Sequence, residues 1–304
     1  MLQVILLTLL LSEFALYVWL GRLLSERGMS IALIVAILLM FALLWRLSHA
    51  LGSFTVTGFL RWRDGRVLPL GSSMSALANE FAARFICFNW SQPFPQLAVG
   101  ADPCGARSGV PILLVHGYVC NRGLWVTFRR ALAAGGLGPI YAVTLEPLFG
   151  GIDTLVSKLD AKIEAICQQT GAPEVMIVAH SMGGLLVRAY LAQANVARVT
   201  KLVTLGSPHQ GTRLAQLGVG VNANQMRDHS EWLKCLEKNE AVLAAKHGRK
   251  PPVILSIYTL NDDLVYPPES SVLAWAENVP VAAIGHMGLV FSPSVARRVT
   301  QHLR

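Results

Sequence analysis

The chain has 304 residues, of which 53% are hydrophobic and only 14% charged, and its formal net charge is +8 at pH 7. A soluble domain carries about a quarter charged residues, so the apolar excess must be concentrated in one part of the chain. The positive charge does not indicate nucleic-acid binding, because the arginines are dispersed and no basic stripe alternates with aromatic residues. Attraction to anionic lipid headgroups is the simpler explanation.

Two apolar segments near the N-terminus predict a membrane hairpin. Residues 2–20 are apolar apart from a few polar residues such as Glu13, and residues 29–47 contain a long unbroken apolar run. Each segment suits a membrane span of about 20 residues, and a short polar turn joins them. We therefore expect a two-helix membrane hairpin over residues 1–50, with Glu13 facing the second helix or lying near a membrane interface.

The first segment could instead be a secretory signal, but it lacks a basic n-region and no small-x-small cleavage site follows it. More arginines follow the second segment than lie in the turn, which favours a cytoplasmic position for both termini and the main domain. The cysteines have no metal-ligand spacing and agree with reduced thiols on that side of the membrane. The sequence thus predicts a multi-pass protein of the inner membrane with a cytoplasmic main domain.

A juxtamembrane linker with one amphipathic helix is expected over residues 51–108. Turn signals stand at Gly52, at Gly58 and at Asp64. Apolar residues then recur at helical spacing over residues 75–90, with polar residues between them. This helix either packs on the main domain, which we favour, or lies at the membrane surface.

From residue 110 onward, short apolar strands alternate with helices, which is typical of a mostly parallel sheet covered on both faces. The expected strands span residues 110–115, 139–144, 174–179, 200–205, 253–258 and 280–284. The expected helices span about 122–134, 152–169, 182–194 and 294–303. Residues 207–250 interrupt this alternation, and we expect this insertion to cover the carboxyl edge of the sheet as a cap.

The segment around Ser181 has the pattern of a nucleophilic serine. An apolar, β-branched run from Val175 to Val178 breaks at small residues around this serine, and apolar residues resume at helical spacing from Leu185. A serine on such a strand–turn–helix bend exposes its hydroxyl beside the first amides of the helix. The pattern is close to G-x-S-x-G, with Ala179 in the first position, where one methyl group can still fit. An ordinary βα turn that contains a serine is the alternative interpretation.

A serine hydroxyl needs a base to accept its proton, and the base needs a carboxylate to orient it. Asp262 and Asp263 follow the expected strand 253–258, and His286 follows the last expected strand. Loops after parallel strands meet at the same edge of a sheet as Ser181. The sequence therefore predicts a catalytic triad of Ser181, His286 and one of the two aspartates, between which the residue types alone do not choose.

The backbone amides of Tyr118 and Met182 are the expected donors to the oxyanion that forms during acyl transfer. Met182 begins the helix after the serine, and Tyr118 follows Gly117, where the missing side chain allows the backbone to approach closely. An ordinary glycine turn is the alternative for this loop. Among the nearby histidines, His116 and His180 are expected to organise turns by hydrogen bonding, and His209 to be a structural loop residue.

Four motifs together resemble those of bacterial lipases and esterases of the α/β-hydrolase superfamily, over roughly residues 109–304. They are Pro111–Tyr118, Ala179–Gly183, Leu205–Thr212 and Gln225–Leu233. The resemblance implies an α/β-hydrolase fold and hydrolysis of carboxyl esters through an acyl-serine intermediate, without a cofactor. The acid motif of such families, D-x-x-V-x-P, matches residues 262–267 and selects Asp262. The cysteine pair and calcium-binding carboxylates of some secreted lipases have no clear counterpart, so no metal is expected.

The sequence thus predicts a membrane-anchored serine hydrolase that cleaves carboxyl esters. Lipid esters are the favoured substrates, because a membrane hairpin keeps the domain where acyl chains are concentrated. Two alternatives remain. The same acyl-enzyme could pass its acyl group to an alcohol or a thiol, or the hydrolase-like domain could serve membrane assembly or binding without catalysis.

Overall fold

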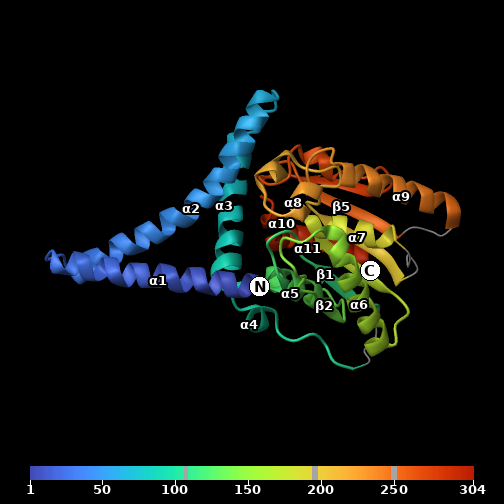
Figure 1. Ribbon diagram of the computed structural model, residues 1–304, viewed down its shortest axis with the longest axis horizontal. Coiled ribbons are helices and arrows are strands. Elements are labelled where there is room, and N and C mark those ends of the chain that lie inside the picture. Colours follow the sequence, from blue (N-terminus) through green and yellow to red (C-terminus); the bar gives the residue numbers. More distant parts are fainter. Residues whose placement is uncertain (106–108, 194–197, 248–251) are drawn as a thin grey trace.

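The computed structural model describes residues 1–105, 109–193, 198–247 and 252–304. A six-stranded sheet with helices on both faces forms one part of the molecule. Of the three long N-terminal helices, α3 stands beside this part, whereas α1 and α2 extend away from it and meet at a turn far from the sheet (Figure 1). The N-terminus lies beside the sheet domain, at the base of the first of these helices.

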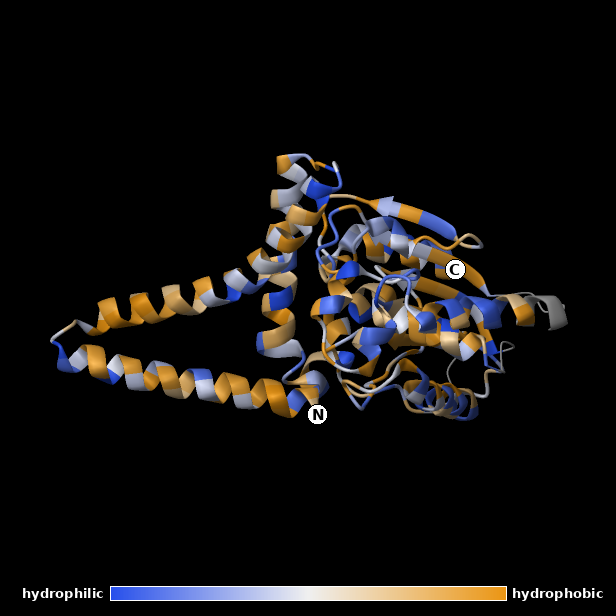
Figure 2. Cartoon of the chain, turned by 45° about the horizontal axis from the view of Figure 1, so that its top comes forward, coloured by the Kyte–Doolittle hydropathy of each residue, from blue (hydrophilic) through white to orange (hydrophobic). Residues whose placement is uncertain are grey.

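The first two helices form the expected hairpin. Helix α1 spans Leu2–Glu26 and α2 spans Ile31–Arg63, and both are long and apolar enough to cross a membrane by length and composition. Figure 2 shows that hydrophobic residues cover most of both helices away from the turn. Glu13 faces the second helix as expected, because its carboxylate binds Arg46 with oxygen–nitrogen distances of 2.6 and 2.8 Å.

The expected turns at Gly52 and Gly58 are wrong, because both glycines lie inside α2. A glycine inside a helix costs about 1 kcal/mol relative to alanine. Burial of Ala50, Thr57 and Arg61 on the same stretch of helix offsets that cost. The turn at Asp64 is present, since the helix ends there and Gly65 follows with a φ of 69°.

Helix α3, Leu70–Ile86, is the expected amphipathic helix, and it begins five residues earlier than its apolar periodicity indicated. It continues into a π-helical turn, Cys87–Ser91, and a short helix, α4, Pro95–Val99, follows. Buried Ala83 and Cys87 belong to the core on one face of the sheet, so the helix packs on the main domain. Its opposite side carries exposed Met74 and Phe85.

The sheet is entirely parallel among the described residues. Its strands are β1 Ile112–Val115, β2 Ile140–Ala142, β3 Val175–His180, β4 Val199–Leu205, β5 Val253–Thr259 and β6 Glu277–Val281, in the order β2-β1-β3-β4-β5-β6. The last strand lies about three residues earlier than expected, because its polar residues Glu277 and Asn278 pair with β5 at the edge of the sheet. Pro280 is tolerated there, since an edge strand leaves outward N–H groups unpaired.

Alternate residues of each strand point to opposite faces of the sheet and belong to two separate hydrophobic cores. Helices α6 Ile152–Thr170 and α7 Met182–Leu191 cover one face. Helices α5 Val126–Ala134, α10 Gly288–Phe291 and α11 Pro293–Leu303 cover the other face, together with α3. Neighbouring strand residues such as Leu113 and Leu114 therefore belong to different cores, as the period of two in a strand requires.

Of the insertion 207–250, the structure describes residues 207–247, and among these the first half covers the sheet edge. A 3-10 turn, Arg213–Leu217, and α8, Val221–Gln225, line the cavity described below. The longer helix α9, Glu231–His247, packs instead on α7, where Glu240 pairs with the buried Arg188. The insertion is therefore a partial cap.

Candidate active site

Ser181 stands at a sharp bend between β3 and α7. Its φ of 55° and ψ of −127° lie outside the regions that residues with a side chain favour, and such strain is concentrated at functional sites. The backbone around the bend is crowded. A methyl group on Gly117 would lie 2.7 Å from Ser181 Cβ, and one on Gly183 would lie 2.7 Å from the carbonyl oxygens of Val115 and His116. These two glycines therefore permit the close approach that the bend requires.

The side chains of His286 and Asp262 form a buried pair. Nδ1 of His286 lies 2.9 Å from Oδ2 of Asp262, and only about 2% and 1% of the two side chains are exposed. The second oxygen of Asp262 accepts hydrogen bonds from the backbone N–H groups of Leu264 and Val265. Because the aspartate occupies Nδ1, the ring presents Nε2 as the nitrogen available to another group.

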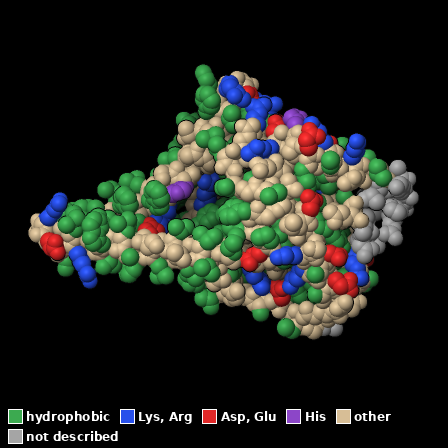
Figure 3. Space-filling model, viewed as in Figure 1, with side chains coloured by type: hydrophobic (Ala, Val, Ile, Leu, Met, Phe, Trp, Pro, Cys, Tyr) green, Lys and Arg blue, Asp and Glu red, His purple; other side chains and the backbone are tan. Residues whose placement is uncertain are grey.

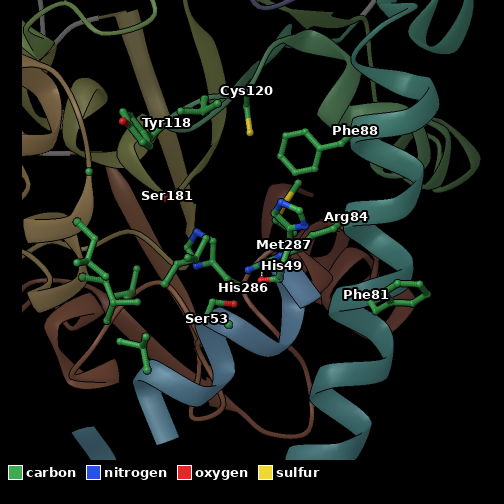
Figure 4. A pocket seen from close by; sticks show the side chains of 18 of the residues that line it. His49, Ser53, Phe81, Arg84, Phe88, Tyr118, Cys120, Ser181, His286 and Met287 are labelled. Carbon is green, nitrogen blue, oxygen red and sulfur yellow. Dashed lines mark hydrogen bonds between the residues drawn. The ribbon is translucent and has the colours of Figure 1, made fainter. Parts of the chain in front are cut away.

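The His286 ring lies against the chain segment that carries Ser181. The rings of His180 and His286 are in contact, with centroids 4.7 Å apart and planes tilted by 53°, and Nε2 of His180 lies 3.3 Å from the His286 carbonyl oxygen. Ser181 and His286 line the same cavity, and Figure 4 draws them near each other at its wall (Figure 4). The structure thus brings the predicted serine, histidine and Asp262 to one place.

The pKa of His286 is raised above its ordinary value of 6.5. Burial alone would lower it, but the carboxylates of Asp262, Glu80 and Asp263 together stabilise the protonated ring more strongly. The ring is therefore a stronger base than an exposed histidine. In its unprotonated form, such a base is able to accept the proton of a serine hydroxyl.

Asp263 binds the loop that carries His286, but through the loop backbone and not through the imidazole ring. Its Oδ1 accepts a hydrogen bond from the backbone N–H of His286 at 3.2 Å, while Oδ2 binds the guanidinium of Arg84 and the hydroxyl of Ser53. The two adjacent aspartates thus have separate contacts. Asp262 binds the imidazole, and Asp263 binds the backbone of the histidine loop and two residues of the N-terminal helices.

Glu80 on α3 is a buried carboxylate that the sequence analysis did not single out. Its Oε2 accepts from the backbone N–H of Gly288 at 2.9 Å, and its Oε1 accepts from Arg84 Nε at 2.8 Å. A methyl group on Gly285 would lie 2.6 Å from the Glu80 side chain, so the histidine loop sits directly on α3. Burial, with the nearby Asp263 carboxylate, raises the pKa of Glu80 to about 7.

Helix α2 also binds the loop that carries the aspartates. The buried guanidinium of Arg61 donates to the carbonyl oxygens of Leu260 and Asp262, at 3.0 and 2.7 Å. The only sequence signals for these contacts were arginines near the end of an apolar segment and a Glu80–Arg84 pair at helical spacing. Both patterns are usual on solvated helix faces, so neither indicated a role beside the site.

The two expected oxyanion donors come from two different segments, the start of α7 and the loop after β1. Met182 begins α7, and the first N–H groups of a helix have no acceptor within it. Tyr118 follows Gly117 in the loop after β1, and its hydroxyl donates to the Val219 carbonyl oxygen at 2.7 Å, which ties this loop to the cap. The next residue, Val119, has a φ of 50°, a strained value for a β-branched side chain.

Two other buried histidines of this region, His116 and His209, make structural hydrogen bonds. Nε2 of His116 accepts from the Leu145 N–H at 2.9 Å, and burial lowers the pKa of His116 to about 4, so the ring is neutral. Nε2 of His209 lies 3.0 Å from the Thr204 hydroxyl, and burial lowers the pKa of His209 well below its usual range. Among the described residues, no group of three or more His, Cys, Asp or Glu side chains could hold a metal ion.

A cavity of about 890 Å³ opens in front of Ser181. Residues of the main domain and the cap form its inner part, including Tyr118, Leu214 and Met226. Residues from all three N-terminal helices form the rest, and most of the lining side chains are apolar. Pockets that bind small ligands in proteins enclose about 300–1,000 Å³, so this one is large enough for a long substrate.

Comparisons with known proteins show which proteins the chain resembles. A family model described as palmitoyl protein thioesterase matches residues 111–246. The chain is 29% identical over 126 residues to a triacylglycerol lipase of Burkholderia plantarii, a match that covers 39% of this chain and 34% of the lipase. It is 28% identical over 118 residues to a triacylglycerol lipase of Pseudarthrobacter phenanthrenivorans, covering 36% of each. The matches thus span about a third of the length of these relatives.

Two solved structures resemble the chain over 66% of its length. The mature form of a Bacillus licheniformis lipase matches with a TM-score of 0.55 and 18% identity, over 95% of that chain. Lipase B of Aspergillus fumigatus matches with a TM-score of 0.56 and 16% identity, over 53% of that chain. The chain therefore has the α/β-hydrolase fold found in lipases and esterases, preceded by two long apolar helices.

Proposed function

We propose that this protein is a membrane-anchored serine hydrolase that cleaves carboxyl esters, with lipid esters as its substrates. One observation carries the proposal. A strained serine at a strand–helix bend shares a cavity with a buried imidazole, which a carboxylate orients through Nδ1. The three side-chain types, their order in the chain and the fold all agree with this chemistry.

In the proposed reaction, Nε2 of His286 accepts the proton of the Ser181 hydroxyl as the oxygen attacks the ester carbonyl carbon. The N–H groups of Tyr118 and Met182 stabilise the negative charge on the carbonyl oxygen. His286 then returns the proton to the leaving alcohol, which leaves an acyl group on Ser181. His286 then accepts a proton from a water molecule as its oxygen attacks the acyl carbon. The bond from that carbon to the Ser181 oxygen breaks, His286 returns the proton to this oxygen, and the carboxylic acid is released.

Helices α1 and α2 are the proposed membrane anchor, with the hydrolase domain in the cytoplasm. Large hydrophobic side chains are exposed along both helices, and among them are Leu11, Phe14, Leu39 and Leu43. At its other end, α1 packs on the main domain, where Leu2 and Leu6 are buried beside Leu148. This packing supports retention of α1 in the working protein and argues against its removal as a signal.

The hydrolysis of p-nitrophenyl butyrate by the purified protein tests the proposal. We expect Ser181→Ala and His286→Ala to lose at least ~100-fold in kcat/KM, as removal of a triad member does in other enzymes. Ser25→Ala, at an exposed position near the end of α1, is the matched control and should retain full activity. Equal rates for the wild type and both triad variants would refute the proposed mechanism.

A thioester substrate is the second candidate, because the matching family model is described as palmitoyl protein thioesterase. The same acyl-serine chemistry would release a thiol in place of an alcohol. Comparison of kcat/KM for a palmitoyl thioester peptide and for the matching palmitoyl oxyester separates the two. A clear preference for the thioester would favour this candidate over the ester hydrolase.

A further inference from the structure

The N-terminal helices form one side of the cavity that contains Ser181. Helix α1 contributes Leu6, Leu9, Leu10 and Glu13, and α2 contributes residues between Trp45 and Val56. Helix α3 adds Phe81 and Phe85, and the π-helical turn that follows it adds Phe88. Figure 3 shows the resulting hollow between the hairpin and the main domain, with hydrophobic side chains around it (Figure 3). The candidate active site is therefore shared between the hydrolase domain and the helices that would anchor it.

The hairpin is closed at its turn and open at its base. Near the turn, a methyl group on Gly21 would lie 3.7 Å from Ile34 and Leu38, so the two helices are in contact there. Toward the main domain the helices diverge, as Figures 1 and 2 show. The cavity fills the space between them at this wider end. An opening between two membrane helices faces the lipid rather than water.

The polar residues in this opening neutralise each other. Arg46 binds both carboxylate oxygens of Glu13 and also donates to Asn89 Oδ1 at 2.7 Å. The Tyr17 hydroxyl donates to the same glutamate. Because the two charges are paired and hydrogen-bonded, they leave no net charge at the edge of the opening. An apolar chain can therefore pass beside them without facing an unpaired ion.

We infer that the acyl chain of a bilayer lipid reaches Ser181 sideways, through the gap between α1 and α2, and that its far end lies against Leu9, Leu10 and Val56. This inference rests on the proposed function and names the substrate class of the same site, a long-chain lipid ester held in the membrane. Apolar lining, continuity with Ser181 and contact with two exposed apolar helices all suit an alkyl chain. A short, soluble ester needs only the end of the cavity near Ser181.

Helix α2 offers a matched pair of substitutions for the test. Gly52 lines the cavity, whereas Gly58 lies on the same helix outside it. A Cβ atom added at either glycine meets no atom within 4 Å, and neither glycine has a positive φ, so both variants should fold. Gly52→Leu narrows the proposed acyl path, and Gly58→Leu is the control. A second pair on the other helix is Leu10→Trp, in the lining, against Leu11→Trp, outside it.

The experiment compares two substrates, with the full-length protein reconstituted in phosphatidylcholine vesicles. For p-nitrophenyl palmitate in the bilayer, we expect Gly52→Leu to lower kcat/KM by ~10-fold or more, the effect of a misfit of one or two methylene groups in an apolar pocket. For soluble p-nitrophenyl butyrate, the same variant should stay within about twofold of the wild type. Both control variants should resemble the wild type with both substrates.

The outcomes distinguish this inference from the proposed function. The inference is overturned if Gly52→Leu and Leu10→Trp hydrolyse both the butyrate and the palmitate ester as fast as the wild type does. The hydrolase assignment would then remain intact. A fall in palmitate hydrolysis in the control variants as well would also overturn it. If the wild type hydrolyses neither ester, the proposed function fails and the inference fails with it.

Discussion

At the residue scale, two adjacent aspartates divide the contacts of one histidine loop. Asp262 binds the imidazole ring, and Asp263 binds the loop backbone and the guanidinium of Arg84. The sequence alone left this choice open, and a family pattern was needed to select Asp262. The geometry provides a physical basis for the choice, because only Asp262 reaches Nδ1 of the ring.

Exchange of each aspartate for asparagine separates their proposed roles. We expect Asp262→Asn to lower kcat by ~1,000-fold or more, because an amide disturbs the ring tautomer and removes the charge that stabilises the imidazolium. Asp263→Asn leaves the ring contact in place, so its loss in kcat should be much smaller and should come with a lower melting temperature. Steady-state kinetics on p-nitrophenyl butyrate give the first quantity, and thermal unfolding in detergent gives the second. A larger kcat loss in Asp263→Asn would reverse the assignment.

The pH profile tests the base itself. A base must be unprotonated to accept a proton, so activity should fall as the pH drops through the pKa of His286, which lies above 6.5. Glu80→Gln removes one of the negative charges that raise this pKa, so the acidic limb of kcat/KM should move to lower pH. If Glu80 only filled space, its substitution would change the maximum of kcat/KM but not the pH at which the acidic limb of the profile lies. A limb that stays in place or moves upward would contradict the proposed coupling.

A site residue could be predicted only where its sequence signal lay in the residues next to it. Ser181 and Gly117 stand in compact motifs, and their surroundings in sequence were enough to single them out. Glu80, Arg84 and Arg61 act on loops that lie about 180 to 210 positions further along the chain. No local pattern records such a partner, because an Arg or Glu on a helix usually faces water.

At the element scale, the N-terminal helices are structural partners of the loops that carry Asp262 and His286. Arg61 binds α2 to the loop that carries Asp262, here called the acid loop. Glu80 binds α3 to the loop that carries His286, here called the histidine loop. A linker was expected over much of this region, yet α2 continues through Gly52 and Gly58 to Arg63. Turn signals failed here because packing against the domain outweighs the modest cost of a glycine in a helix.

Two arginines two positions apart on α2 allow a controlled test of this attachment. Arg61 is buried and binds two carbonyl oxygens of the acid loop, whereas Arg63 is half exposed and lies beside Asp64. Hydrogen bonds from a charged group contribute about 1.5–3 kcal/mol, so Arg61→Met should destabilise the loop by that order. We expect a ~10-fold loss of kcat on the soluble ester. Arg63→Met should change little, and equal effects of the two variants would argue against the attachment.

The expected strands and helices of the main domain were largely correct for a physical reason. Strands buried on both faces are continuous apolar runs, as in residues 112–115 and 175–179, and such runs can be recognised in the sequence alone. Strand β6 was displaced by about three residues, because it lies at the sheet edge and half of it is polar. The cap was the least predictable element, since the same insertion contains both cavity-lining turns and a helix packed on α7.

At the scale of the whole molecule, we propose that the anchor holds the hydrolase domain on the cytoplasmic side of the membrane. Cys235 is exposed on that domain and Cys104 is exposed in the segment just before β1, while Cys87, Cys120 and Cys167 are buried. A membrane-impermeant maleimide should therefore leave the protein unlabelled in intact cells and label it after the inner membrane is permeabilised. A variant with both exposed cysteines changed to serine is the control for specificity. Labelling in intact spheroplasts would place the domain on the periplasmic side.

The central claim is that Ser181 is the nucleophile, and the most direct measurement is the position of a covalent adduct. Purified protein is treated with a fluorophosphonate, digested, and analysed by peptide mass spectrometry. The account predicts one modified peptide, with the adduct on Ser181, and a large loss of this adduct in His286→Ala. An adduct on another serine, or undiminished labelling without His286, would contradict the account.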